Sequence, residues 1–85
     1  MEKNKHGKYK CPCCGFYTYD KPTGNTFQVC PVCFWEDDQV QYNDIFYDGG
    51  ANSISLKNAR KNFKKFGAIQ EIFKINVRKP TEEEI

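Results

Sequence analysis

Cys11-Pro12-Cys13-Cys14-Gly15 and Cys30-Pro31-Val32-Cys33 decide the fold of this chain of 85 residues. Taken by their outer cysteines, the two stretches form C-x2-C pairs separated by fifteen residues. This spacing is typical of a four-thiolate zinc site, in which each tight turn aims two sulfurs at one ion. Proline after the first cysteine presets the backbone for such a turn, and glycine after the second accepts the positive φ on which it often ends. The pattern predicts one structural zinc ion, bound by Cys11, Cys14, Cys30 and Cys33.

The second pair has no glycine after it. Phe34 stands where Gly15 stands after the first pair. Because positive φ is uncommon for residues other than glycine, we expect Phe34 to begin the next element rather than to close a free turn.

Cys13 is the odd cysteine. It occupies the x position of C-P-x-C, where the side chain usually points away from the metal, and we expect a small packed or half-exposed spare thiol. The alternatives are a reactive thiol beside the metal and a ligand that replaces Cys11 or Cys14.

Disulfide bonds are the competing explanation for five cysteines, although an odd number leaves one unpaired. The basic N-terminus has no apolar stretch after it, so we expect no signal peptide. No apolar run approaches the roughly 20 residues that span a membrane. We therefore expect a cytoplasmic protein without membrane contact, where C-x2-C pairs are more often metal sites than bridges. Iron in a rubredoxin-like centre is the alternative to zinc.

The composition fits a small metal-stapled α+β fold. A single domain of this size buries only about 60–65% of its unfolded surface, so a bound metal adds needed stability. Thirteen aromatic side chains can fill a small core, and we interpret them as core residues rather than as a base-stacking platform.

Two strands and one helix are predicted around the cysteines. Strand-forming residues at 16–19 and 26–29 flank a turn at 20–25, which indicates a zinc-ribbon-like β-hairpin joining the two cysteine pairs. Residues 34–52 follow as an acidic connector. A C-terminal amphipathic helix begins after Ser53 or Ser55 and ends at Gly67, with apolar residues at helical spacing. Residues 69–73 continue that spacing for a further short turn. The apolar residues of the helix are Leu56, Ala59, Phe63 and Phe66.

The charges are segregated along the chain. Residues 1–10 carry +3, residues 34–50 carry −5, residues 51–79 carry +7 and the last six carry −3. We place a flexible basic arm at 1–8, the domain at 9–80 and an acidic tail at 81–85. The helix has a basic arc of about 140° beside its apolar stripe. This arc consists of Lys57, Arg60, Lys61, Lys64 and Lys65.

The acidic block after the second cysteine pair has two interpretations. In the structural one, Trp35 packs behind the metal, and Glu36, Asp37 and Asp38 pair with the basic helix. In the functional one, this block and the helix lysines form a surface that binds a protein partner. Burial of Trp35 would favour the first.

Several blocks taken together resemble the bacterial cysteine-rich CPCC family. They are Cys-Pro-Cys-Cys-Gly at 11–15, Cys-Pro-Val-Cys-Phe-Trp-Glu-Asp-Asp at 30–38, Gly-Gly-Ala-Asn at 49–52 and Ser-Leu-Lys-Asn-Ala-Arg at 55–60. The resemblance spans about residues 9–80. It implies a small bacterial zinc-ribbon-like protein and adds no established activity.

An enzyme is not expected. Four thiolates close the coordination shell of zinc, whereas a catalytic zinc keeps an open position. The single histidine, His6, lies in the basic arm, and the chain has no phosphate-binding glycine loop or nucleophile motif.

Three functions remain open. The first is a zinc-binding protein-interaction or regulatory module. The second is a nucleic-acid-binding zinc ribbon that uses the basic helix face and the arm, although the metal-bound chain would be close to neutral. The third is a redox or iron-binding, rubredoxin-like protein, in which Cys13 could take part.

Overall fold

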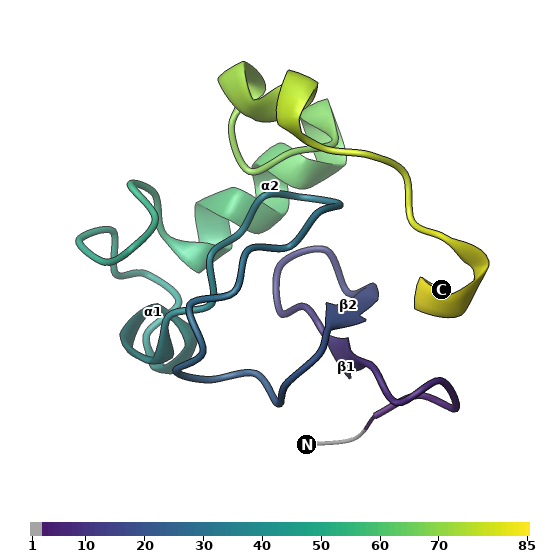
Figure 1. Cartoon of the computed structure of the whole chain (residues 1–85). Coiled ribbons are helices and arrows are strands. Elements are labelled where there is room, and N and C mark those ends of the chain that lie inside the picture. The colour runs from purple at the N-terminus through teal and green to yellow at the C-terminus, as the bar shows by residue number, and fades with distance from the viewer. Residues whose placement is uncertain (1–2) are drawn as a thin grey trace.

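The computed structural model describes residues 3–85, in which two short strands and a few helices are joined by long loops (Figure 1). None of the described helices is long and apolar enough to cross a lipid bilayer. The chain is a small α+β fold with one antiparallel hairpin. Its elements in order are β1 (Tyr9–Lys10), β2 (Tyr17–Tyr19), α1 (Gln39–Asn43), α2 (Leu56–Phe66) and the 3-10 helices η1 (Glu71–Asn76) and η2 (Glu82–Glu84).

The observed hairpin encloses the first cysteine turn. Strand β1 pairs antiparallel with β2, and Tyr9 lies opposite Tyr19. Residues 26–29 do not pair with β2 but bridge to the chain beyond the second cysteine turn, at Val29 and Glu36. The predicted hairpin between residues 16–19 and 26–29 is therefore wrong. Each C-x2-C segment forms a tight turn. The residues before each turn therefore pair with the residues that follow the same turn.

Helix α2 begins and ends where its capping residues predict. The Ser55 hydroxyl accepts a hydrogen bond from the Asn58 amide, and Gly67 ends the helix at φ 80°. Leu56 and Ala59 are fully buried, and Phe63 packs edge-on against Phe16. The apolar spacing beyond Gly67 continues as the 3-10 helix η1 rather than as α-helix.

Hydrogen bonds to backbone carbonyls connect α2 and the segment after it to both cysteine turns. Arg60 donates from Nε to the Pro12 carbonyl at 2.9 Å, and the Ile69 amide donates to the Cys33 carbonyl at 2.9 Å. The helix and the four cysteines thus form one packed unit.

The acidic connector is held by a buried polar network. Asp38 caps α1 through the amides of Val40 and Gln41, and its second oxygen accepts the Ala51 amide at 2.8 Å. Gln41 is fully buried and donates to three backbone carbonyls, while Asn52 hydrogen-bonds both backbone groups of Glu36. Buried amides of this kind specify one loop conformation, because every polar group must find its partner.

We predict that Gly50→Ala destabilises the protein by about 1–3 kcal/mol, because a methyl group there would force apart a packed network. A Cβ at Gly50 would lie 2.6 Å from Asp38 Oδ2 and 2.8 Å from Gln41 Cδ. Gly49→Ala is the matched control, since its Cβ would meet only the exposed Tyr47 side chain, which can move. Urea unfolding of both variants measures the difference, and equal stabilities would contradict this description of the connector.

The two ends of the described chain touch each other. Asn4 donates from Nδ2 to the Glu83 carbonyl at 2.7 Å, and Arg78 makes a two-pronged ion pair with the buried Glu84 at 2.8 and 2.9 Å. Hydrogen bonds from Arg78 lower the pKa of the Glu84 carboxyl, although burial opposes them. The predicted limits of the arm (1–8) and tail (81–85) stay predictions, and residues 1–2 of the arm lie outside the described part.

Candidate metal centre

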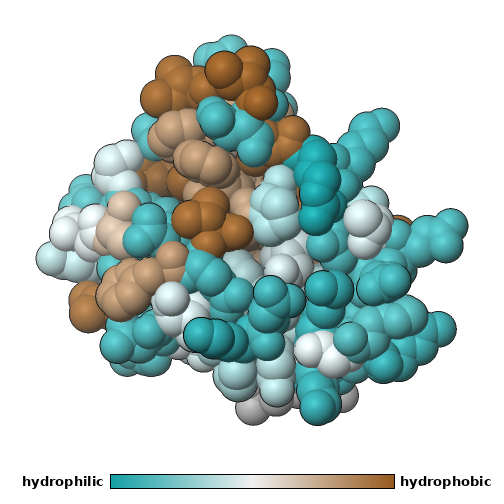
Figure 2. Space-filling model, viewed as in Figure 1, coloured by the Kyte–Doolittle hydropathy of each residue, from teal (hydrophilic) through white to brown (hydrophobic). Residues whose placement is uncertain are grey.

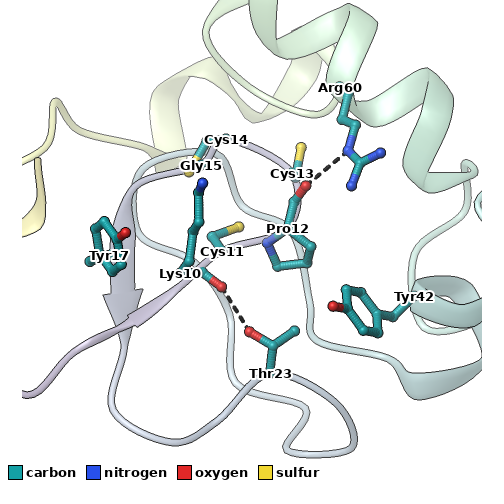
Figure 3. A pocket seen from close by; sticks show the side chains of 10 residues that line it. All are labelled: Lys10, Cys11, Pro12, Cys13, Cys14, Gly15, Tyr17, Thr23, Tyr42 and Arg60. Atoms are coloured by element: carbon teal, nitrogen blue, oxygen red, sulfur yellow. Dashed lines mark hydrogen bonds between the residues drawn. The ribbon is translucent and has the colours of Figure 1, made fainter. Parts of the chain in front are cut away.

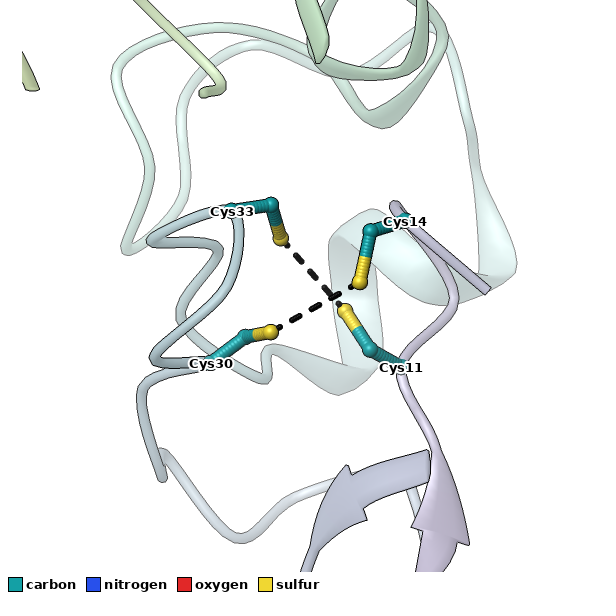
Figure 4. Close-up of side chains that lie close together, drawn as sticks. All are labelled: Cys11, Cys14, Cys30 and Cys33. Carbon is teal, nitrogen blue, oxygen red and sulfur yellow. Dashed lines mark hydrogen bonds between the residues drawn. The ribbon is translucent and has the colours of Figure 1, made fainter. Parts of the chain in front are cut away.

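Four sulfurs converge between the two cysteine turns (Figure 4). The Sγ atoms of Cys11, Cys14, Cys30 and Cys33 all lie within 4.8 Å of one another. Cys11 Sγ is 3.6 Å from Cys33 Sγ, and Cys14 Sγ is 3.7 Å from Cys30 Sγ. A tetrahedral ion with metal–sulfur bonds of about 2.3 Å places its sulfurs about 3.8 Å apart. The cluster therefore fits a metal ion, and its members are the four cysteines expected from spacing.

The two cysteine turns have the same backbone geometry. The Gly15 amide donates to the Cys11 carbonyl at 2.9 Å, and the Phe34 amide donates to the Cys30 carbonyl at 2.8 Å. Gly15 has φ 83° and Phe34 has φ 76°. The prediction that Phe34 begins a new element is wrong, because it closes the second turn in the left-handed conformation. Packing on Phe73, with ring centroids 4.7 Å apart, offsets the strain of that conformation.

We predict that Phe34→Gly is more stable than Phe34→Ala by about 1 kcal/mol, because only glycine adopts this φ without strain. Both variants lose the contact with Phe73, so their difference reports the backbone alone. Elsewhere in a chain alanine usually stabilises more than glycine. Thermal unfolding of the metal-loaded variants makes the comparison, and the ordinary order would argue against a strained turn at Phe34.

The centre is shielded from water. Cys11, Cys30 and Cys33 are fully buried, and Cys14 is half-buried. Trp35 belongs to the same buried cluster and is itself fully buried. Thr18 donates from Oγ1 to Cys30 Sγ at 3.0 Å, and Tyr19 Oη lies 3.8 Å from Cys11 Sγ. Burial raises the pKa of Tyr19, so this side chain stays a neutral hydroxyl beside the sulfurs.

Hydrogen bonds among the crowded sulfurs shift the pKa values of the cysteines in opposite directions. Hydrogen bonds with Cys11 and Cys14 lower the pKa of Cys30. Hydrogen bonds with Cys11 raise the pKa of Cys14 and of Cys33. Because thiolates rather than thiols bind a metal ion, its affinity falls as the pH falls.

Cys13 stands outside the four-sulfur cluster. It is 8% exposed and, with Cys11 and Cys14, lines a pocket at the first turn (Figure 3). This position agrees with the expected packed spare thiol. Whether Cys13 is reactive stays a prediction.

The structure separates the predicted binding surface into a buried half and an exposed half. Trp35, Asp37 and Asp38 are buried, so this conformation does not offer them to a partner. Their carboxylates accept backbone amides instead of lysines. Asp37 takes the Gly24 amide at 2.8 Å and the Thr26 hydroxyl at 2.6 Å. The expected pairing of Glu36, Asp37 and Asp38 with the helix is therefore wrong, because none of them forms an ion pair with it in the described chain and backbone amides already satisfy Asp37 and Asp38.

The basic arc of α2 consequently keeps its charge. Lys57, Lys61, Lys64 and Lys65 are exposed, and Arg60 is half-buried. Within residues 3–85 the ion pairs are Lys8 with Asp20 and Arg78 with Glu84, so none involves this arc. The ammonium groups of Lys57 and Lys65 lie over the rings of Phe46 and Phe66. These rings carry no negative charge, so both lysines keep their positive charge.

Sequence reasoning missed two residues beside the sulfurs, Thr18 and Tyr19, and two that hold the connector, Gln41 and Asn52. Asn52 belongs to the Gly-Gly-Ala-Asn block, but that block assigns it no role. A lone threonine or glutamine forms no spacing pattern from which its role could be predicted.

We predict that Cys14→Ser and Cys33→Ser each abolish retention of a stoichiometric metal ion and lower stability strongly, because four-thiolate metal binding and folding are linked. Cys13→Ser, which changes a neighbouring cysteine outside the cluster, should keep the metal and cost little. Metal analysis after gel filtration, together with thermal unfolding, reads both effects. Equal damage from Cys13→Ser would overturn the assignment of the ligands.

Comparison with known families gives one match that covers nearly the whole chain. The model of the family described as Cysteine-rich CPCC matches residues 9–84. The match extends past residue 80, the predicted end of the domain, into the segment 81–84. No curated protein matches the chain.

Proposed function

Since the chain belongs to the cysteine-rich CPCC family, we propose that it is a small zinc-stabilised binding module whose metal centre is structural rather than catalytic. The observation that carries this proposal is the closed sulfur cluster. Four thiolates fill the coordination shell of a tetrahedral zinc ion, which leaves no position on the metal for a substrate or an activated water.

Zinc suits this donor set better than its alternatives. Thiolates are soft ligands that select zinc or iron at a tetrahedral site. A bound divalent cation would neutralise two of the four thiolate charges and fix both cysteine turns. The redox alternative would require iron in this cluster or chemistry at Cys13.

The exposed part of the molecule suggests the kind of partner. Helix α2 carries five basic residues and no acidic one between Leu56 and Phe66. An unpaired basic face attracts anionic macromolecules and speeds their encounter. Asp37 and Asp38 are buried and Glu36 is half-buried, so the acidic block does not serve as the second half of the surface. We therefore assign the module an anionic partner that docks on the basic arc of α2.

Titration of the zinc-loaded, ¹⁵N-labelled protein with heparin, used as a generic polyanion, tests this proposal. Amide shifts should concentrate in residues 56–66, and adding salt should reverse them because the contacts are between exposed charges. The variant Lys61→Glu/Lys64→Glu should lose at least about tenfold in affinity. The variant Lys5→Glu/Lys74→Glu makes the same charge change outside the arc and serves as the control. Equal losses in the two variants, or no binding, would contradict the proposal.

A further inference from the structure

A pocket of about 480 Å³ lies against the first cysteine turn, and the candidate metal ligands Cys11 and Cys14 belong to its lining (Figure 3). Its lining combines three elements that are far apart in sequence. Lys10 and Tyr17 come from the hairpin, Tyr42 from α1 and Arg60 from α2. Its floor is the turn itself, with Pro12 and Cys13.

Two cations stand at this pocket. Arg60 is fixed there because its Nε donates to the Pro12 carbonyl at 2.9 Å. The remaining guanidinium nitrogens make no hydrogen bond within residues 3–85. Lys10 is exposed, and its ammonium has no carboxylate partner in the same range. Arg60 and Lys10 therefore bring two positive charges and free donors to the pocket, beside the sulfurs of Cys11 and Cys14.

The pocket is continuous with the basic arc of α2. Arg60 belongs to both, and Lys64 follows one helical turn later on the same side of the helix. Lys57 precedes Arg60 by three residues and lies on that side too. A chain of anionic groups laid along α2 would thus reach the pocket at Arg60.

Two aromatic rings complete the site. Figure 3 shows Tyr17 and Tyr42 on opposite sides of the lining residues. Both are half-buried, so each is held by the fold while part of its surface faces solvent. Aromatic faces beside a basic track are the combination that binds single-stranded nucleic acid, because bases stack on rings while phosphates follow the cations.

We propose that the basic arc of α2 and this pocket form one binding site for single-stranded nucleic acid. The backbone follows Lys64, Arg60 and Lys57, and unpaired bases enter the pocket to stack on Tyr17 and Tyr42. Duplex bases are stacked on each other and cannot enter it. An acidic protein would use the lysines but would gain little from two tyrosine rings beside cations. This inference rests on the proposed function, since it names the class of its anionic partner.

Fluorescence anisotropy with labelled dT12 at low and moderate salt tests the proposal on the zinc-loaded full chain. We expect dT12 to bind more tightly than a 12-base-pair duplex, with an affinity that falls steeply with salt. Tyr42→Leu should weaken dT12 binding about tenfold, because leucine keeps the bulk and removes the stacking face, whereas Tyr42→Phe should bind like the parent. Tyr17→Leu and Tyr17→Phe repeat this comparison on the second ring. Zinc content and thermal unfolding of every variant show that it is folded.

The other outcomes separate this inference from the function on which it rests. Equal binding of duplex and dT12 with no effect of the leucine variants would overturn the single-strand site and leave an anionic partner in place. Binding of polyglutamate but not of dT12 would overturn it in favour of an acidic protein. Failure of dT12, duplex, polyglutamate and heparin alike would remove the proposed function as well.

Discussion

Four sulfur atoms within 4.8 Å of one another, largely buried, are the constraint on which this structure depends. The region around them has little regular structure of its own, since the hairpin beside it is only two and three residues long in its strands. A cation that binds four thiolates connects two turns separated by fifteen residues and supplies on the order of 10 kcal/mol in comparable zinc sites. The neighbouring elements then attach to the turns. Arg60 binds the backbone of the first, and Ile69 that of the second.

The distribution of charge follows from how the connector folds. Asp37 and Asp38 are buried against backbone amides of Gly24 and Ala51, each thirteen residues away along the chain. Hydrogen bonds from the amides of Ala51, Gln41 and Val40 lower the pKa of Asp38 despite its burial. These carboxylates are therefore satisfied without the helix lysines. The result is a basic face on α2 that forms no ion pair within residues 3–85, which is the physical basis for expecting an anionic partner.

The sequence predicts the parts of this fold that are encoded by short, local patterns. The C-x2-C spacing identifies the four clustered cysteines, and Ser55 and Gly67 mark the ends of α2. Strand pairing is a non-local choice, and β propensity at 26–29 does not reveal that these residues bridge across their own turn. Phe34 misleads because tertiary packing on Phe73 offsets an unfavourable φ. The pocket is also beyond sequence reasoning, since it joins Lys10, Tyr42 and Arg60 only after folding.

Elemental analysis of protein purified without added metal, combined with thiol counts on native and denatured protein, tests the central claim most directly. We expect one zinc ion per chain. We also expect one thiol that reacts in the native, metal-loaded state, Cys13, and five after denaturation with a chelator. Iron in the centre, or a metal-free protein with paired cysteines, would contradict a structural zinc site and would redirect the function toward redox chemistry.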